Sequence, residues 1–163
     1  MTQYIEAFIP AVQQNGLNTQ KNASFEGTLA VTGALTGAAA ITSSSATAGI
    51  GYAAGAGAAV TQTTSRATGV TVQGVSGTIQ TATNSLAAEA SAVFVVTNAS
   101  VAIGDVVIVS IRSGMVALNT RVTVTTVADG SFKLTVVNGN VASGTAETGA
   151  IIINFAVIKA VAA

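Results

Sequence analysis

From Ala59 onward, hydrophobic and polar residues alternate in short runs that are separated by turn residues. Runs of this length, rich in Val, Ile, Thr and Phe, are typical of β-strands. The pattern predicts strands at 60–65, 69–73, 78–81, 92–97, 105–111, 120–127, 131–137 and 150–161. Residues 84–90 (NSLAAEA) fit either one helical turn or a loop. Eight strands in about a hundred residues favour an all-β fold, a β-sandwich of jelly-roll-like type.

The period of two within these runs predicts which side chains face the core. The runs 92–97 and 105–111 are apolar and β-branched almost throughout, which predicts buried strands. Asp129-Gly130 predicts a two-residue hairpin with a type I′ turn, in which both residues have positive φ. The inward residues predicted for the two strands of this hairpin are Val122, Val124, Val127, Phe132, Leu134 and Val136.

The first 24 residues read as an arm and a linker. If residues 1–11 are helical, one face carries Tyr4, Ile5, Phe8 and Ile9. This apolar edge fits two roles, a terminus that packs on its own domain or an arm that anchors the chain to a partner protein. Residues 15–24 (NGLNTQKNAS) are polar and rich in turn formers, as in a linker.

Glycines then punctuate short apolar-Thr segments between residues 25 and 42. Short β segments of this kind cannot bury a face alone and need neighbours. In a trimer three copies supply the missing faces to one another, which predicts a stalk with Leu29, Val31, Leu35 and Ile41 along the trimer axis. The alternative is a flexible linker of small residues.

Charge is scarce. Charged residues make up 7% of the 163 residues, and six basic residues balance six acidic ones. A free monomer of this composition has little protection against self-association, so sister chains or a partner are expected to cover much of its surface. The same scarcity argues against nucleic acid as a partner. Residues 27–65 hold no charge, but Gly, Ser and Thr interrupt them too often for a membrane span.

Candidate chemistry is sparse as well. The chain has no His and no Cys, which removes the commonest general base, the commonest metal ligand and thiolate chemistry. Asp105 and Asp129 are explained by turns, and the glutamates fall in the arm, linker and loops. The basic residues are expected to be solvated strand-edge charges, with Arg112 or Lys159 available to pair across an interface. We therefore expect no enzyme, no metal site and no cofactor.

One glycine-rich motif, GIGYAAGAG at residues 49–57, superficially matches a nucleotide-binding loop. Such a loop needs a strand before it and a helix after it. Here a Ser/Thr-rich loop precedes and a β pattern follows, so the nucleotide interpretation is rejected. Tyr52 within the motif is expected to be a packed ring whose hydroxyl meets the backbone.

Two stretches carry a family resemblance. Residues 51–80 (GYAAGAGAAVTQTTSRATGVTVQGVSGTIQ) and 150–160 (AIIINFAVIKA) resemble a domain that recurs in tailed-bacteriophage virion proteins: head decoration (cement) proteins, head fibres and some tail fibres. The resemblance covers roughly residues 49–160, and residues 25–42 resemble glycine-punctuated segments of trimeric phage fibres. It implies a structural, non-enzymatic homotrimer attached to the particle through its N-terminal part. No site residues transfer from it.

The resulting expectation has three parts: an attachment arm and linker (1–24), a β stalk or connector (25–48) and a β-sandwich (49–163). The function expected is decoration and stabilisation of a phage capsid at multi-subunit junctions, with the major capsid protein as partner and the virion surface as location. The alternative is a tail fibre, or a protein that binds a host receptor glycan.

Overall fold

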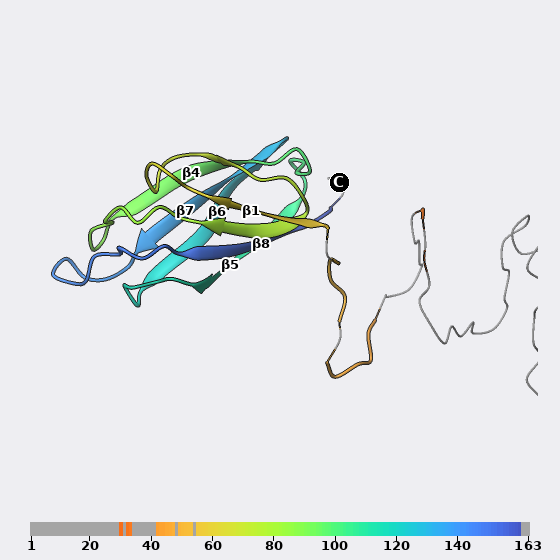
Figure 1. Ribbon diagram of the computed structural model, residues 1–163, viewed down its shortest axis with the longest axis horizontal. Coiled ribbons are helices and arrows are strands. Elements are labelled where there is room, and N and C mark those ends of the chain that lie inside the picture. Colours follow the sequence, from red (N-terminus) through yellow and green to blue (C-terminus); the bar gives the residue numbers. More distant parts are fainter. Residues whose placement is uncertain (1–29, 31, 34–41, 48, 54, 161–163) are drawn as a thin grey trace, which may run out of the picture. The chain divides into compact units, whose positions relative to one another are not determined.

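The computed structural model describes residues 30, 32–33, 42–47, 49–53 and 55–160. The chain divides into two units, Met1–Ser43 and Ser44–Ala163, and every described strand belongs to the second. Figure 1 shows these strands as two packed layers. They are β1 (Gly57–Thr61), β2 (Val70–Thr71), β3 (Ser76–Gln80), β4 (Ser91–Thr97), β5 (Val106–Ser113), β6 (Thr120–Ala128), β7 (Ser131–Asn138) and β8 (Ile152–Ile158).

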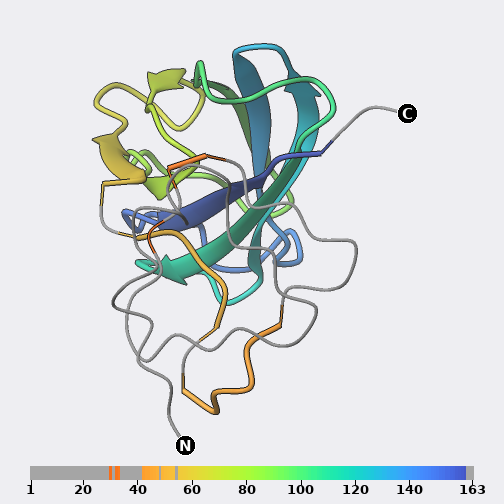
Figure 2. The ribbon, with the colours of Figure 1, turned by 90° about the vertical axis from the view of Figure 1, so that its right-hand side faces the viewer.

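The strands form two four-stranded sheets, which confirms the predicted all-β sandwich (Figures 1 and 2). The first sheet has the order β1-β3-β8-β5 and the second the order β2-β4-β7-β6. The pairs β1-β3 and β2-β4 are parallel, and the other neighbours are antiparallel. Residues 84–90 form a loop with one isolated bridge, from Leu86 to Glu147. The parallel edge pairs are a feature that the sequence pattern did not predict.

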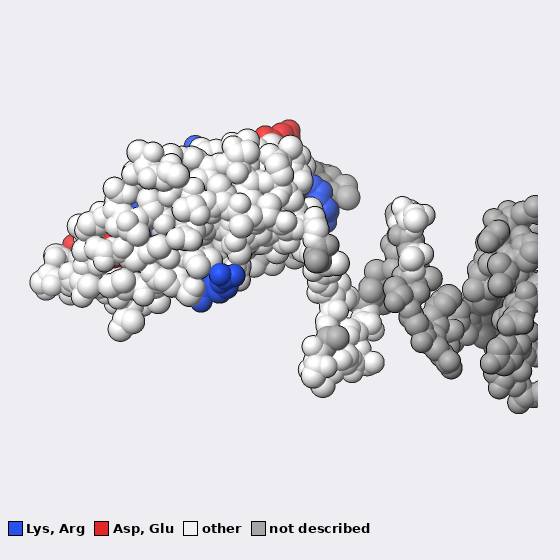
Figure 3. Space-filling view, in the orientation of Figure 1, with Lys and Arg blue, Asp and Glu red and all other residues white. Residues whose placement is uncertain are grey.

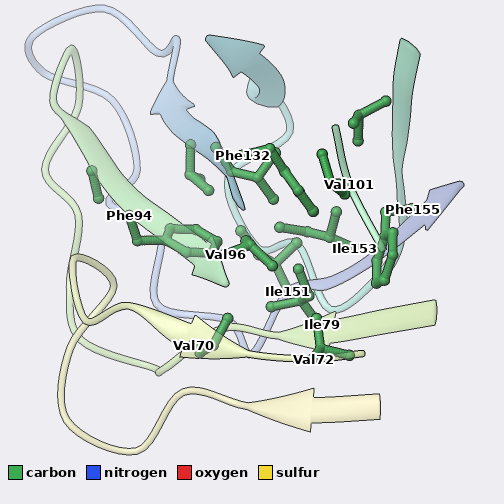
Figure 4. Close-up of a cluster of buried hydrophobic side chains, with 14 of the residues drawn as sticks. Val70, Val72, Ile79, Phe94, Val96, Val101, Phe132, Ile151, Ile153 and Phe155 are labelled. Carbon is green, nitrogen blue, oxygen red and sulfur yellow. The ribbon is translucent and has the colours of Figure 1, made fainter. Parts of the chain in front are cut away.

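The core lies between the sheets and is built from alternate residues of each strand (Figure 4). Phe132 of β7 and Phe155 of β8 meet across the sheets, with ring centroids 5.7 Å apart and planes tilted by 50°. Burying a side chain of this size stabilises the fold by about 1.5–3 kcal/mol. The predicted inward residues of the β6–β7 hairpin are confirmed: Phe132, Leu134 and Val136 are buried, while Val122, Val124 and Val127 pack against the core.

Two strands predicted as buried are buried on one face only. In β4, Phe94 is buried, but Val93 is 47% exposed; in β5, Val107 is buried, but Val106 is 51% exposed. The prediction treated a β-branched apolar run as one that is covered on both faces. In a two-layer sandwich only one face of each sheet is covered, so half of each run lies on the outside.

The hairpin between β6 and β7 is confirmed, but the predicted type I′ turn is wrong. Gly130 has φ 72°, whereas Asp129 has no positive φ. The Asp129 carboxylate accepts a hydrogen bond from the Ile103 N–H (2.9 Å), and the Gly130 N–H donates to the Val101 carbonyl (2.9 Å). Contacts with the loop before β5 therefore set the conformation of this turn.

The strand register gives the sandwich two distinct ends. Gly57 of β1, Val106 of β5 and Ile158 of β8 lie at the end where the chain enters the sheets, which we call the near end (Figure 1). The loops 81–90, 114–119 and 139–151 lie at the opposite end, which we call the loop end. Contacts at each end can therefore serve different partners.

Candidate functional site

The residues predicted for attachment and for the trimer axis lie outside the described residues. They are Tyr4, Ile5, Phe8 and Ile9 of the arm and Leu29, Val31, Leu35 and Ile41 of the stalk. Their roles stay predictions. The described residues instead present a buried polar network at the loop end, an ion pair at the near end and two exposed sheet faces.

Glu147, in the loop between β7 and β8, is the centre of the buried network. Its fully buried carboxylate accepts hydrogen bonds from the Thr120 hydroxyl (2.7 Å) and from the N–H groups of Gly149 (2.7 Å), Ala117 (3.0 Å) and Val116 (3.1 Å). Burial raises the pKa of the Glu147 carboxyl, but these hydrogen bonds outweigh it and hold the pKa below its ordinary value. The carboxylate therefore remains ionised at neutral pH inside the protein.

Arg66, in the segment after β1, extends the network to a second set of loops. It is 3% exposed and donates to the Thr81 hydroxyl (2.9 Å) and to the carbonyl oxygens of Asn84, Glu147 (3.2 Å) and Gly149 (2.7 Å). Burial lowers the pKa of the Arg66 guanidinium, and the charge of Glu147 opposes that shift. The expectation that Arg66 is a solvated strand-edge charge is wrong, because carbonyl and hydroxyl oxygens replace its water.

The network of Glu147 and Arg66 holds loops together, because its polar side-chain atoms form hydrogen bonds with other protein groups. Among the described residues no buried side-chain nitrogen or oxygen lacks a hydrogen bond. Glu147 binds the loop 114–119, and Arg66 binds the loops 81–90 and 139–151. The hydrogen bonds of Glu147 and Arg66 therefore join the loops of the loop end to one another.

A polar groove of about 300 Å³ lies beside this network, where β1 and β3 end. It offers hydroxyl and amide groups but no titratable side chain. Its lining residues are Thr61, Gln62, Thr63, Thr64, Gln80, Thr81, Ala82, Thr83, Asn84 and Ala150. Across the part of the chain that the structure describes, no three acidic residues gather in a way that could hold a metal ion.

Lys159 and Asp105 form an ion pair at the near end. Lys159 Nζ lies 2.5 Å from Asp105 Oδ2, and the Asp105 carboxylate also accepts from the N–H groups of Ala102 (2.8 Å) and Ala160 (3.3 Å). The hydrogen bond from Lys159, followed by that from Ala102, holds the pKa of Asp105 below its ordinary value. The structure pairs Lys159 with Asp105 of its own chain, and the pairing of Lys159 or Arg112 across an interface stays a prediction.

The outer faces of both sheets are nearly free of charge. In the first sheet, Val106, Ile108 and Ile158 are about half exposed, and Val106 lies opposite Ile158 in the register. Arg112 is the single charged residue in the four strands of this sheet. The second sheet exposes Val93 and carries two cations, Arg121 of β6 and Lys133 of β7. The side of the sandwich drawn in Figure 3 is mostly uncharged, with a few separate patches of Lys or Arg and of Asp or Glu.

Residues 50–52 lie on the outer face of the first sheet. Together with Ile108, Ala156 and Ile158, they line an apolar hollow of about 420 Å³. The Tyr52 hydroxyl donates a hydrogen bond to the Val157 carbonyl of β8. This contact confirms the expectation that the hydroxyl of Tyr52 meets the backbone, and it fixes the chain that leads into β1 against the sheet.

The loop end exposes aliphatic side chains of its own. Leu118 is 85% exposed, and Val116 and Val141 are also exposed beside a groove of about 510 Å³. Asn119 and Asn140 join the two loops through a side-chain hydrogen bond of 2.9 Å. The two loops therefore present these side chains together.

Comparison with protein-family models, with curated proteins and with solved structures gives no match. The described residues contain no helix long and apolar enough to cross a membrane.

Proposed function

We propose that this protein is a structural component of a tailed-bacteriophage particle, a homotrimeric cement or head-fibre protein anchored through its N-terminal region. The observation that carries the proposal is the nearly uncharged, partly aliphatic outer face of the first sheet, which has Arg112 as the one charged residue in its strands. Exposed aliphatic patches of this kind mark interaction surfaces in soluble proteins. The proposal also rests on the resemblance of residues 51–80 and 150–160 to phage virion domains.

The two-ended sandwich supports the same role. The chain enters the sheets at Gly57, and β8 leaves at the same end, opposite the loop end; in the proposed arrangement the residues before the sandwich bind the particle. The Glu147 and Arg66 network then holds the far loops in shape. This arrangement suits a domain that projects from a surface to which its N-terminal arm is bound.

Stabilisation of a capsid by such a protein is additive. Each specific interface of about 1,200–2,000 Å² has modest strength, but one chain that bridges several capsid subunits joins their contacts. Opening one junction of the shell then requires several interfaces to separate together. The major capsid protein is the partner in this proposal, and the virion surface is the location.

The direct test uses purified particles whose genome encodes the chain. Antibodies against the sandwich should label the heads in electron micrographs, and particles that lack the protein should release DNA at a lower temperature. Adding the purified protein back should restore the release temperature. Label on the tail tip alone would favour the tail-fibre alternative, and unlabelled particles with no change in release temperature would refute the proposal.

The alternative of glycan recognition has less support in the described residues. Glycan sites usually offer an exposed aromatic ring beside polar groups, but Phe94, Phe132 and Phe155 are buried in the core. Tyr52 is half exposed and lies on the sheet, away from the polar groove of the loop end. The described surface therefore suits protein contact better than sugar stacking.

A further inference from the structure

We propose that the outer face of the first sheet, β1-β3-β8-β5, is the surface through which copies of the sandwich contact one another. The inference rests on the proposed function, because it assigns the homotrimer of that proposal to one face of the domain. The occupant is a second copy of the same chain. Val106, Ile108 and Ile158 form the centre of the contact, with residues 50–52 beside them.

The first sheet carries little charge. The four strands of this sheet contain no acidic residue and one cation, Arg112 near the end of β5. A charged partner surface would lose its water here and gain almost no opposite charge in return. An identical face carries the same uncharged side chains, so two copies can lose water from apolar groups without separating ions from solvent.

The segment that leads into β1 lies on the same face. Residues 50–52 already lie on this face, and Tyr52 is tied to β8 through the Val157 carbonyl. Chains that associate through the residues before the sandwich bring their lead-in segments together. The face on which that segment lies is then the one nearest to the neighbouring copies. The outer face of the second sheet has no such segment among the described residues.

The edge of the first sheet also favours contact between copies. β5 is an edge strand of eight residues, and its first six residues are uncharged and mostly β-branched. A long, apolar edge strand is prone to association unless something covers it. Contact between copies over β5 and β8 covers both the edge and the half-exposed aliphatic side chains.

The size of the face sets the strength of the contact. The four strands have five to eight residues. With strands ~4.8 Å apart and about six residues on average at ~3.3 Å per residue, the face spans roughly 20 Å by 20 Å, or ~400 Å². A stable interface buries ~800 Å² on each partner. The sheet face alone is too small for a tight trimer. It therefore adds to the association of the preceding residues, and changes on it shift the trimer without abolishing every contact.

The chain offers an identical substitution on each outer face. Val106→Lys places a charge on the first sheet, and Val93→Lys places the same charge on the second; the two valines are 51% and 47% exposed. Both are made in the full-length protein. The mass of each is measured by light scattering over a dilution series, with circular dichroism and thermal melting to show that both are folded.

We expect the wild type to be a trimer and Val93→Lys to dissociate over the same concentration range. For Val106→Lys we expect the concentration at which the trimer dissociates to rise at least about tenfold. If the trimers of both variants dissociate at the same concentration, or if Val93→Lys dissociates more readily, the assignment of the face is overturned but the virion role is not. A monomeric wild type overturns both the face assignment and the homotrimer of the proposed function. A trimer that depends on Val106 but is absent from particles would refute the virion role alone.

Cross-linking gives a second, independent readout. The natural chain has no cysteine, so Val106→Cys and Val93→Cys each introduce a unique thiol. A short bis-maleimide should join chains of the Val106→Cys protein at protein concentrations where the Val93→Cys protein stays unlinked. Linkage at position 93 and none at position 106 would assign the interface to the second sheet and overturn the proposal.

Discussion

Replacing Glu147 with Gln tests whether the buried carboxylate holds the loop end together. The carboxylate accepts hydrogen bonds from three backbone N–H groups and one hydroxyl. Glutamine has nearly the same shape but carries one acceptor oxygen and one NH₂ group. The hydroxyl of Thr120 can rotate to accept from that NH₂ group, whereas a backbone N–H cannot. Either orientation of the amide therefore leaves a backbone N–H, of Ala117 or of Gly149, facing another donor.

The expected loss of stability follows from these contacts. Hydrogen bonds to a charged group contribute ~1.5–3 kcal/mol, and an orphaned buried donor costs ~1–3 kcal/mol. Because these effects overlap, we expect Glu147→Gln to lower the free energy of unfolding by about 3 kcal/mol. That is a large part of the ~5–15 kcal/mol typical of a domain, yet it leaves the domain folded at room temperature.

Urea denaturation at neutral pH measures this loss. With a slope of about 2 kcal/mol per molar, the midpoint should fall by about 1.5 M. Glu89→Gln is the matched control, since Glu89 is exposed and the same change there should alter the free energy of unfolding by less than about 0.5 kcal/mol. Equal midpoints for the wild type and Glu147→Gln would refute the claim that the carboxylate fastens the loops.

The same pair of proteins predicts a pH dependence. The pKa of Glu147 is lower in the folded protein than in the unfolded chain, where it is about 4.3. Its contribution to stability is therefore complete above that unfolded value and is lost as the pH falls through the folded pKa. The stability difference between wild type and Glu147→Gln should shrink as the solution is acidified below about pH 4.3. A difference that stays constant in acid would contradict the assigned direction of the pKa shift.

Four further substitutions test single positions. Gly114→Ala should destabilise the fold by about 2 kcal/mol or more, because φ is 84° and an added Cβ meets backbone atoms of Ala150. Gly130→Ala, with φ 72° and open space, should cost about 1 kcal/mol; equal urea midpoints would contradict the crowding at Gly114. Phe155→Ala should lower the unfolding free energy by about 3–5 kcal/mol in calorimetry, and a loss under 1 kcal/mol would argue against its core position. Lys159→Met should move the pKa of the Asp105 carboxyl upward in an NMR titration; an unchanged pKa would show that the ion pair is absent in solution.

The sequence pattern predicted the strands well because the period of two depends on local geometry. Phe132, Leu134 and Val136 fall on one face whichever strand lies beside them. Strand ends were less predictable because pairing sets them. β1 begins at Gly57, ahead of the predicted residue 60, since Gly57 pairs with Ser76 of β3. That partner is too distant in sequence for a local pattern to reveal.

The buried network was missed because its partners come from four separate segments. Arg66 and Glu147 are 81 residues apart, and most of their contacts are to backbone atoms, which carry no sequence signal. One signal was present. Arg66 ends an uncharged stretch that begins at Gly27, and a chain that avoids charge over such a length keeps one where it has a specific partner. The order of the sheets was likewise beyond local reasoning, since its parallel edge pairs are set by contacts between distant segments.

The scarcity of charge and the exposed aliphatic faces have a common explanation in how the described charges are used. Arg66 and Glu147 are buried in the loop network, while Asp105 and Asp129 hold backbone N–H groups at the near end. Four of the few ionised groups thus serve the interior and the loops. Few charged side chains remain on the outer faces of the sheets, so charge does little to oppose contact between two such faces. Arg112 is then the one charged residue in the strands of the first sheet, so the outer face of that sheet is the most weakly charged surface to test for contact between copies.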